Sequence, residues 1–305
     1  MKMQATVKHR HAKRQSKFDN VFDVISTILL VLALLIVLYP LYFVVIASVS
    51  DATAISTGKV ILLPKGISFV GYKRILEDAS IWTGYKNSII YTLASTVLGV
   101  ITTVMAGYSF SRKDLVGRKW LNLIYVFTMY FNAGLIPTYL TVKSIGLVSS
   151  PWAVILMGSV SVYNVIIARS FFVNNIPDEL FEAASIDGCG NARFFISIVV
   201  PLSKAIIAVI ALYYAVAQWN GYFNALIYLS KQEHFPLQLV LREILLGSQS
   251  IAADVSDIEA IQEMQRIAAT IKYGVIVVAS VPMLILYPFI QKYFVKGVMI
   301  GSVKG

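Results

Sequence analysis

The sequence offers few side chains for covalent or metal chemistry. Its three histidines are His9, His11 and His234, and its single cysteine, Cys189, can form neither an internal disulfide nor a cysteine metal cluster. No His-Glu-x-x-His zinc motif, Gly-x-Ser-x-Gly nucleophile motif or Gly-x-x-x-x-Gly-Lys-Ser/Thr phosphate loop occurs. The glycines at 188 and 190 follow no predicted strand and therefore do not indicate a dinucleotide-binding turn. The sequence does not predict an enzyme, and any ATP must be bound by another chain.

One polar segment, EAASIDGCGNARFFISIVVP at 182–201, lies between two long apolar stretches. Upstream of it, Asn175 can cap a helix, Pro177 is tolerated in a first turn, and the two acids that follow suit the positive end of the helix dipole. Gly188 ends this helix because glycine tolerates left-handed backbone. A second short helix follows, which Pro201 interrupts or joins to the next apolar stretch. The segment predicts a helix, a turn and a helix.

A second group of polar and aromatic side chains lies inside the apolar stretches themselves. Because polar groups in lipid are costly, these side chains should face protein or a wet cavity. Aromatic faces and amide groups suit a sugar, whose rings have apolar faces and hydroxyl edges. The residues expected along a solute path are Tyr214, Gln218 and Tyr222 on one helix stripe, Asn220 and Asn224 on another, and Ser159, Tyr163 and Asn132 in earlier stretches. The alternative for each of them is a hydrogen bond between helices.

These residues belong to a strongly apolar chain. Of its 305 residues, 57% are hydrophobic and 14% are charged, and the mean hydropathy is +0.73. The hydrocarbon layer of a bilayer is about 30 Å thick, so a spanning helix needs about 20 apolar residues. The stretches long enough to span are 24–48, 88–110, 120–140, 152–172, 205–229 and 273–295. We therefore expect an all-α membrane protein with six transmembrane helices.

Charge predicts the orientation of these helices. Lys and Arg gather on the side of the basic N-terminal arm at 1–19, which the positive-inside rule places in the cytoplasm. Both termini and the loop at 175–201 are then cytoplasmic, and an amphipathic run at 255–270 predicts a helix over the outer mouth. The six-span domain is expected at 20–296 and a cytoplasmic tail at 297–305. This topology explains the net charge of +10 without nucleic acid, and anionic membrane lipid is the expected partner of the arm.

The polar segment has a regular spacing of acidic, small and proline residues. It reads Glu-Ala-Ala, three residues, Gly, nine residues, Ile, one residue and Val-Pro, with the matching residues Glu182, Ala183, Ala184, Gly188, Ile198 and Pro201. This spacing resembles the coupling loop of permease subunits in bacterial ATP-binding cassette (ABC) importers, in which leucine takes the place of Val200. The Trp219-Asn220 pair resembles the Trp-Asn motif in the fifth span of that family. The tail at 291–305 is similar to the second permease of its carbohydrate branch, the maltose and oligosaccharide importers.

The resemblance implies a type I ABC importer permease fold in the bacterial cytoplasmic membrane, and it implies partners. These are a second, homologous permease, two cytoplasmic ATPase subunits that hold ATP and Mg, and an external solute-binding protein that delivers a sugar; this chain itself needs no cofactor. In the family the coupling helix lies in a cleft of an ATPase subunit and transmits its closure to the spans, an alternating-access step. The residues implied in this contact are Glu182, Ala183, Ala184, Asp187 and Gly188. Asp187 has a second interpretation, as the cap of the second short helix.

An ion-coupled secondary transporter with six spans is the alternative. Such a carrier needs an ionisable residue deep inside a span, whereas the charges here lie at the ends of the stretches, as Asp23 and Arg169 do. The coupling-loop spacing also has no role in such a carrier. The sequence therefore favours an importer permease.

Overall fold

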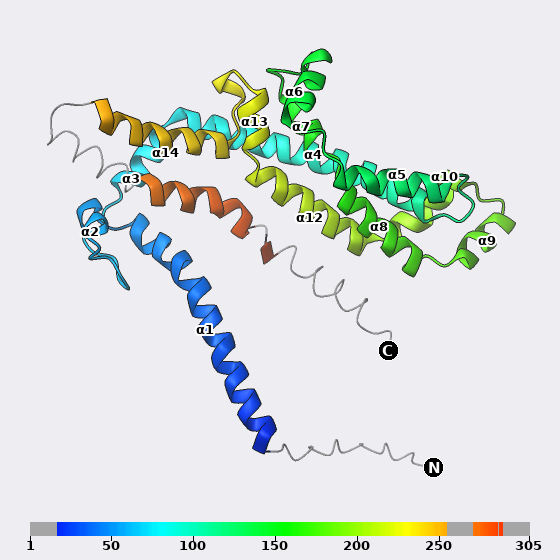
Figure 1. The fold of residues 1–305 in the computed structure, drawn as a ribbon, viewed down its shortest axis with the longest axis horizontal. Coiled ribbons are helices and arrows are strands. Elements are labelled where there is room, and N and C mark those ends of the chain that lie inside the picture. The colour runs from blue at the N-terminus through cyan, green and yellow to red at the C-terminus, as the bar shows by residue number, and fades with distance from the viewer. Residues whose placement is uncertain (1–16, 255–270, 286, 289–305) are drawn as a thin grey trace, which may run out of the picture.

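The chain folds into helices joined by short connections (Figure 1). The computed structural model describes residues 17–254, 271–285 and 287–288. Its helices are α1 (Lys17–Ser48), α2 (Ala52–Ser56), α3 (Val70–Glu77), α4 (Ala79–Ser111), α5 (Arg118–Tyr130), α6 (Leu135–Ser144), α7 (Pro151–Met157), α8 (Val162–Asn175), α9 (Asp178–Ile186), α10 (Asn191–Phe194), the π-helix η1 (Phe195–Val199), α11 (Val200–Leu202), α12 (Lys204–Asn220), α13 (Phe223–Tyr228), the 3-10 helix η2 (Gln232–His234), α14 (Leu237–Asp254) and an unlabelled helix, Ile271–Ile285. The amphipathic run at 255–270, the tail at 297–305 and most of the arm at 1–19 lie outside the described residues.

Helix α4 is the element against which the other helices pack. Figure 1 shows α14, α12 and α8 lying along it, from the end marked by α3 to the end marked by α9. Its buried face is rich in small residues at helical spacing, namely Gly84, Ser88, Ser95, Gly99, Thr103 and Gly107. A Cβ atom added to Gly99 would lie 2.9 Å from the ring of Tyr214, and one added to Gly107 would lie 2.7 Å from the Cβ of Ala168. Small side chains therefore let α12 and α8 approach the backbone of α4.

At the α3 end, polar side chains of α4 hold the segment that leads into α14. Asn87 donates from its side-chain amide to the carbonyl oxygens of Glu233 (2.8 Å) and Phe235 (3.0 Å). The Oγ of Ser88 accepts a hydrogen bond of 2.8 Å from the backbone N–H of Leu237. These bonds give main-chain groups near the start of α14 partners in place of water.

Most of helix α1 stands apart from this bundle, and only its C-terminal end, near Ala47 and Ser48, is buried (Figure 1). No residue in its most apolar 18-residue window is buried. The hydroxyls of Tyr39 and Tyr42 donate to the carbonyl oxygens of Ile61 and Leu62, which connect the helix to the segment that follows it. The apolar helices predicted at 24–48 and 88–110 are confirmed by α1 and α4.

The stretch at 120–140, predicted as one span, is broken in the structure. It forms α5 and α6, which meet at 113°. Gly134 has a φ of +88° at the break, and the side-chain oxygen of Asn132 accepts the N–H of Gly134 at 2.9 Å. Asn132, expected on a solute path, instead stabilises this turn with that oxygen, and its side chain is exposed.

Two further stretches are also broken. The stretch at 152–172 divides into α7 and α8, bent by 42°, and the stretch at 205–229 divides at Gly221 into α12 and α13. The described residues contain two helices long and apolar enough to cross a bilayer, or up to five if each bent pair counts as one span. Of the sixth predicted stretch, residues 273–285 and 287–288 are described and are helical, so the count of six stays a prediction.

We expect Gly107→Ala to lower the melting temperature of the purified protein, since the added Cβ would clash with Ala168 and lies 3.1 Å from the backbone nitrogen of Arg169. Overpacking of this kind costs about 1–3 kcal/mol. The matched control is Gly190→Ala, because a Cβ there meets no atom within 4 Å. Equal melting temperatures for the two variants in detergent would contradict close packing of α4 on α8.

Candidate functional site

Helix α9 is the first helix predicted from the polar segment. It begins directly after Pro177, and its first turn carries Asp178 and Glu179, whose charges suit the positive end of the helix dipole. No side chain caps it. The prediction of Asn175 as the cap is wrong, because its side-chain amide donates to the carbonyl oxygen of Phe171 (2.9 Å) within α8.

The turn after α9 depends on glycine. Gly188 has a φ of +73°, a conformation that strains any residue with a Cβ, and the N–H of Cys189 donates to the carbonyl oxygen of Ala184 at 2.8 Å. The next helix, α10, begins after Gly190 without a side-chain cap. Asp187 therefore does not cap the second helix, and its exposed carboxylate remains a predicted contact for a partner.

The structure separates the two alanines that the sequence placed on one docking surface. Ala184 is buried in a core cluster of this chain, where Phe181 meets Phe194 edge to face at 5.3 Å between ring centroids. Glu182 and Ala183 are exposed, and Ile186 is 86% exposed. These three residues belong to the outward face of α9, while Ala184 holds the helix to the bundle.

The second predicted helix is not a simple α-helix ended by Pro201. It continues from α10 through the π-helix η1 into α11, and Pro201 lies inside α11. Proline lacks an N–H and crowds the preceding turn, and the wider π turn directly upstream accommodates it. The direction of the chain changes only at Ser203, where the helical run Asn191–Leu202 meets α12 at 81°.

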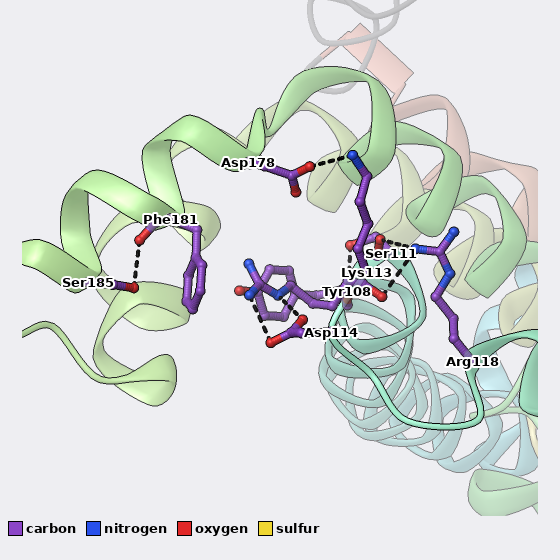
Figure 2. A network of polar contacts seen from close by, with 9 residues as sticks. Tyr108, Ser111, Lys113, Asp114, Arg118, Asp178, Phe181 and Ser185 are labelled. Carbon is purple, nitrogen blue, oxygen red and sulfur yellow. Dashed lines mark hydrogen bonds and ion pairs between the residues drawn. The ribbon is translucent and has the colours of Figure 1, made fainter.

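A polar network joins the end of α4 to α9 (Figure 2). Arg112 donates from Nε and Nη2 to the two carboxylate oxygens of Asp114, at 2.9 and 3.0 Å. Its Cζ also lies 3.5 Å from the centroid of the Phe181 ring of α9. A second link is the ion pair between Lys113 Nζ and Asp178 Oδ2, at 2.6 Å. Residues that are far apart in sequence therefore fix α9 against α4.

The network is charged at neutral pH. The hydrogen bonds donated by Arg112 hold the pKa of the Asp114 carboxyl below its ordinary value. The hydrogen bond that Lys113 donates to Asp178 raises the pKa of the Lys113 ammonium group above its ordinary value. A lowered pKa for an acid and a raised pKa for a base both favour the ionised forms.

A cavity of about 740 Å³ lies between α7, α8, α12 and the break at Gly221. Its polar lining residues are Ser161, Tyr163, Asn164, Tyr213, Tyr214, Gln218 and Asn224. A Cβ atom at Gly158 would clash with the side-chain oxygen of Gln218, so the glycine leaves space for the Gln218 amide. Within the described residues this lining contains no Asp, Glu, Lys or Arg. Apolar ring faces next to amide and hydroxyl groups can bind a solute with both kinds of surface.

Four of the residues predicted for the solute path line this cavity, and four do not. Tyr163, Tyr214, Gln218 and Asn224 line it. Ser159 is buried and donates to the carbonyl oxygen of Ile155 (2.5 Å), Asn220 donates to the carbonyl oxygen of Val216 (2.9 Å), and Asn132 lies in the α5–α6 turn. The expected stripe from Tyr214 to Tyr222 is wrong, because α12 ends before Gly221 and Tyr222 no longer follows its helical spacing.

The residues selected for the solute path did not include Ser161, Asn164 or Tyr213. Ser161 and Asn164 belong to the start of α8, where the break from α7 turns them toward the cavity, and a continuous helix at 152–172 gave no reason to select them. The serine before a helical run is a capping signal that marks this break, since the Oγ of Ser161 accepts the N–H of Asn164 at 3.3 Å.

Comparison with known proteins decides the family. The family described as "Binding-protein-dependent transport system inner membrane component" matches residues 10–300 of this chain. The chain belongs to this family. It is a permease subunit of an ABC importer and a multi-pass protein of the inner membrane. This result decides against the ion-coupled secondary transporter.

The permease resembles proteins named for sugar transport. It is 40% identical to the "Polygalacturonan/rhamnogalacturonan transport system permease protein YtcP" of Bacillus subtilis over 94% of this chain and 99% of that protein. It is 29% identical to the "Maltodextrin transport system permease protein MdxG" of the same organism, over 77% and 80% of the two chains. A solved structure, described as a bacterial ABC transporter involved in the import of the acidic polysaccharide alginate, matches 92% of the permease and 99% of its own chain, with a TM-score of 0.82 and 32% identity.

Tyr214 joins three parts of the permease, and we expect Tyr214→Phe to lower its stability. The hydroxyl is 2.6 Å from Thr103 Oγ1 on α4 and accepts the N–H of Ser161 at 3.0 Å. Losing both bonds inside the membrane should cost about 1–2 kcal/mol. The control is Tyr163→Phe, whose hydroxyl bonds to no described residue. Thermal unfolding in detergent measures the difference, and equal stability of the two variants would contradict this role.

Proposed function

We propose that this permease forms half of a membrane pathway for acidic oligosaccharides, with ATP hydrolysed by separate subunits. The observation that carries the proposal is the cavity lined by Tyr163, Gln218 and Asn224, whose ring and amide groups match the apolar faces and hydroxyl edges of a sugar. Two relatives support an acidic oligosaccharide as the substrate. The permease is 40% identical to one named for polygalacturonan, a polymer of a uronic acid, and it resembles a transporter described as importing alginate.

The topology proposed for this pathway has six spans and both termini in the cytoplasm. The distribution of Lys and Arg supports this topology, in which α9 is cytoplasmic and the α3 end is outside. The arm is 1–19, the spanning domain is 20–296 and the tail is 297–305. The external solute-binding protein then delivers the sugar at the α3 end.

The second permease subunit completes the pathway by packing on surfaces that this chain leaves open. Helix α1 buries none of its most apolar window, whereas a third of the corresponding window of α4 is buried. The described side chains of α5 are also not buried. Helices that make few contacts within one subunit are suited to contact a second, homologous one.

Coupling to the ATPase subunits takes place on the outward face of α9. Glu182 and Ala183 are exposed there, and Gly188 and Asp187 form the adjoining turn. The carboxylate of Glu182 would pair with a base in the ATPase cleft, and Ile186 adds an apolar contact. ATP and Mg belong to those subunits, so the permease supplies shape and charge only.

We expect Glu182→Ala to leave the permease in the membrane but to reduce ATP-dependent uptake more than tenfold, since removing one member of a buried ion pair costs about 2–5 kcal/mol. Gly188→Ala should act in the same direction through backbone strain. The matched control is Glu77→Ala, an exposed acid of α3 at the opposite end of the molecule. Uptake and ATPase rates of the reconstituted importer test this, and unchanged uptake by both Glu182→Ala and Gly188→Ala would refute the docking proposal.

Arg242 is the residue proposed to recognise the acidic group. It is half-buried on α14, its Cζ lies 5.7 Å from the ring centroid of Tyr222, and it pairs with no acid among the described residues. In the sequence, Tyr222 lies between Gly221 and Asn224, and both of these residues line the cavity. A guanidinium next to an aromatic ring can hold a carboxylate while the ring contacts the sugar face.

We expect Arg242→Gln to reduce the maximal uptake rate of an oligogalacturonate about tenfold, because a hydrogen bond to a charged group contributes about 1.5–3 kcal/mol. Uptake of the neutral methyl ester of the same oligosaccharide should change little. The control variant is Lys231→Gln, an exposed base. Equal losses for acid and ester would show that Arg242 does not recognise the carboxylate. If the unaltered importer takes up maltodextrin but not oligogalacturonate, the proposal of an acidic substrate is refuted.

A further inference from the structure

We infer that Arg112 is a positioning residue of the transport cycle, which makes α9 and α4 move together. The inference rests on the proposed docking of α9 on an ATPase subunit. It names a second path for the movement of α9, through side chains and into α4, in addition to the covalent connection into α12.

The guanidinium of Arg112 is held on two sides. Asp114 binds it with two parallel hydrogen bonds, a geometry that fixes the plane of the group. The Phe181 ring of α9 lies 3.5 Å from its Cζ. The side chain is only 16% exposed, so the stacking is less weakened by water than a surface contact. Movement of Phe181 therefore carries Arg112, and with it the end of α4.

The other polar link between these elements is weaker. Lys113 and Asp178 form an ion pair at 2.6 Å, but their side chains are 78% and 47% exposed. Exposed ion pairs contribute little because water and salt screen them. Arg112 therefore provides the stiffer contact, and Lys113 provides a control position on the same segment.

The covalent route to α12 is long and bent. After α9 the chain passes through the Gly188 turn, the π-helix η1 and the 81° change of direction at Ser203. The buried hydroxyl of Ser203 has no hydrogen-bond partner among the described residues, so it adds no bond that would stiffen the bend. A displacement of α9 is lost more easily along this path than through the direct contact with Arg112.

Helix α4 is suited to distribute the movement. Its small-residue face lies against Ala168 of α8 and Tyr214 of α12, and both helices form walls of the cavity. Closely packed helices transmit displacement because their contacts have low compressibility. A shift of α4 at its α9 end therefore changes the position of two cavity walls at once.

The experiment compares four variants of the complete importer in vesicles: Arg112→Gln, Phe181→Leu, Phe181→Tyr and the control Lys113→Gln. Sugar uptake and ATP hydrolysis are measured on the same sample, together with the amount of ATPase that co-purifies. Phe181→Leu keeps an apolar contact with Phe194 but removes the aromatic face, whereas Phe181→Tyr keeps the face.

We expect sugar molecules imported per ATP hydrolysed to fall about threefold to tenfold in Arg112→Gln and Phe181→Leu, the range that loss of a part-buried cation–π contact allows. Phe181→Tyr and Lys113→Gln should keep the original ratio, and all four complexes should retain their ATPase. A ratio unchanged in Phe181→Leu overturns the inference even if Arg112→Gln fails to assemble. Equal losses in Phe181→Leu and Phe181→Tyr overturn it as well, because only packing would then matter.

Failure of the docking proposal gives a different result. If α9 does not bind the ATPase, Glu182→Ala transports normally in the same assay. If α9 binds the ATPase but Arg112 does not transmit its movement, Glu182→Ala loses uptake while Phe181→Leu keeps the original ratio. The two results separate the docking of α9 from the role of Arg112.

Discussion

Close approach of helices at the small residues of α4 is the constraint on which the rest of the structure depends. Lipid tails are as apolar as leucine, so the hydrophobic effect does not bring helices together inside a membrane, and packing and hydrogen bonds must do so. The glycines at 84, 99 and 107 allow α14, α12 and α8 to contact one partner. Segments separated by more than a hundred residues thereby share a single supporting helix.

Hydrogen bonds divide the polar side chains of the membrane region into two groups. Tyr214 and Ser159 use their hydroxyls to hold helices and turns in place. Gln218, Tyr163 and Asn224 bond through their side chains to no described residue and line the cavity. Because an unpaired polar group in hydrocarbon is costly, the second group is consistent with a wet interior that a sugar can enter.

Apolar length and the coupling-loop spacing predicted much of this arrangement. They located α1, α4 and α9, and the Gly188 turn followed from the chemistry of glycine. They did not locate the breaks at Gly134 and Gly221, because glycine also occurs inside continuous membrane helices, and only the surrounding packing decides which glycine bends the chain.

The same limit explains the errors at the candidate site. Helical spacing placed Tyr214 and Tyr222 on one stripe because a single helix was assumed to contain both. In the structure α12 ends at Asn220, so this assumption fails. The role of Ala184 was also ambiguous from the sequence, since a small residue permits close contact with a partner and with the chain's own core alike. The contact between Arg112 and Phe181 joins residues about seventy positions apart, and no local pattern indicates it.

The breaks between α7 and α8 and between α12 and α13 have a consequence for the energetic barrier to a solute. Interrupted helices expose carbonyl and amide groups of the main chain, which are tolerated at membrane depth only where protein or water meets them. Both breaks adjoin the cavity. In the pathway proposed above, a hydrophilic molecule in this cavity would meet these polar groups in place of lipid, so the hydrocarbon thickness left for the importer to open would be smaller than that of the surrounding bilayer.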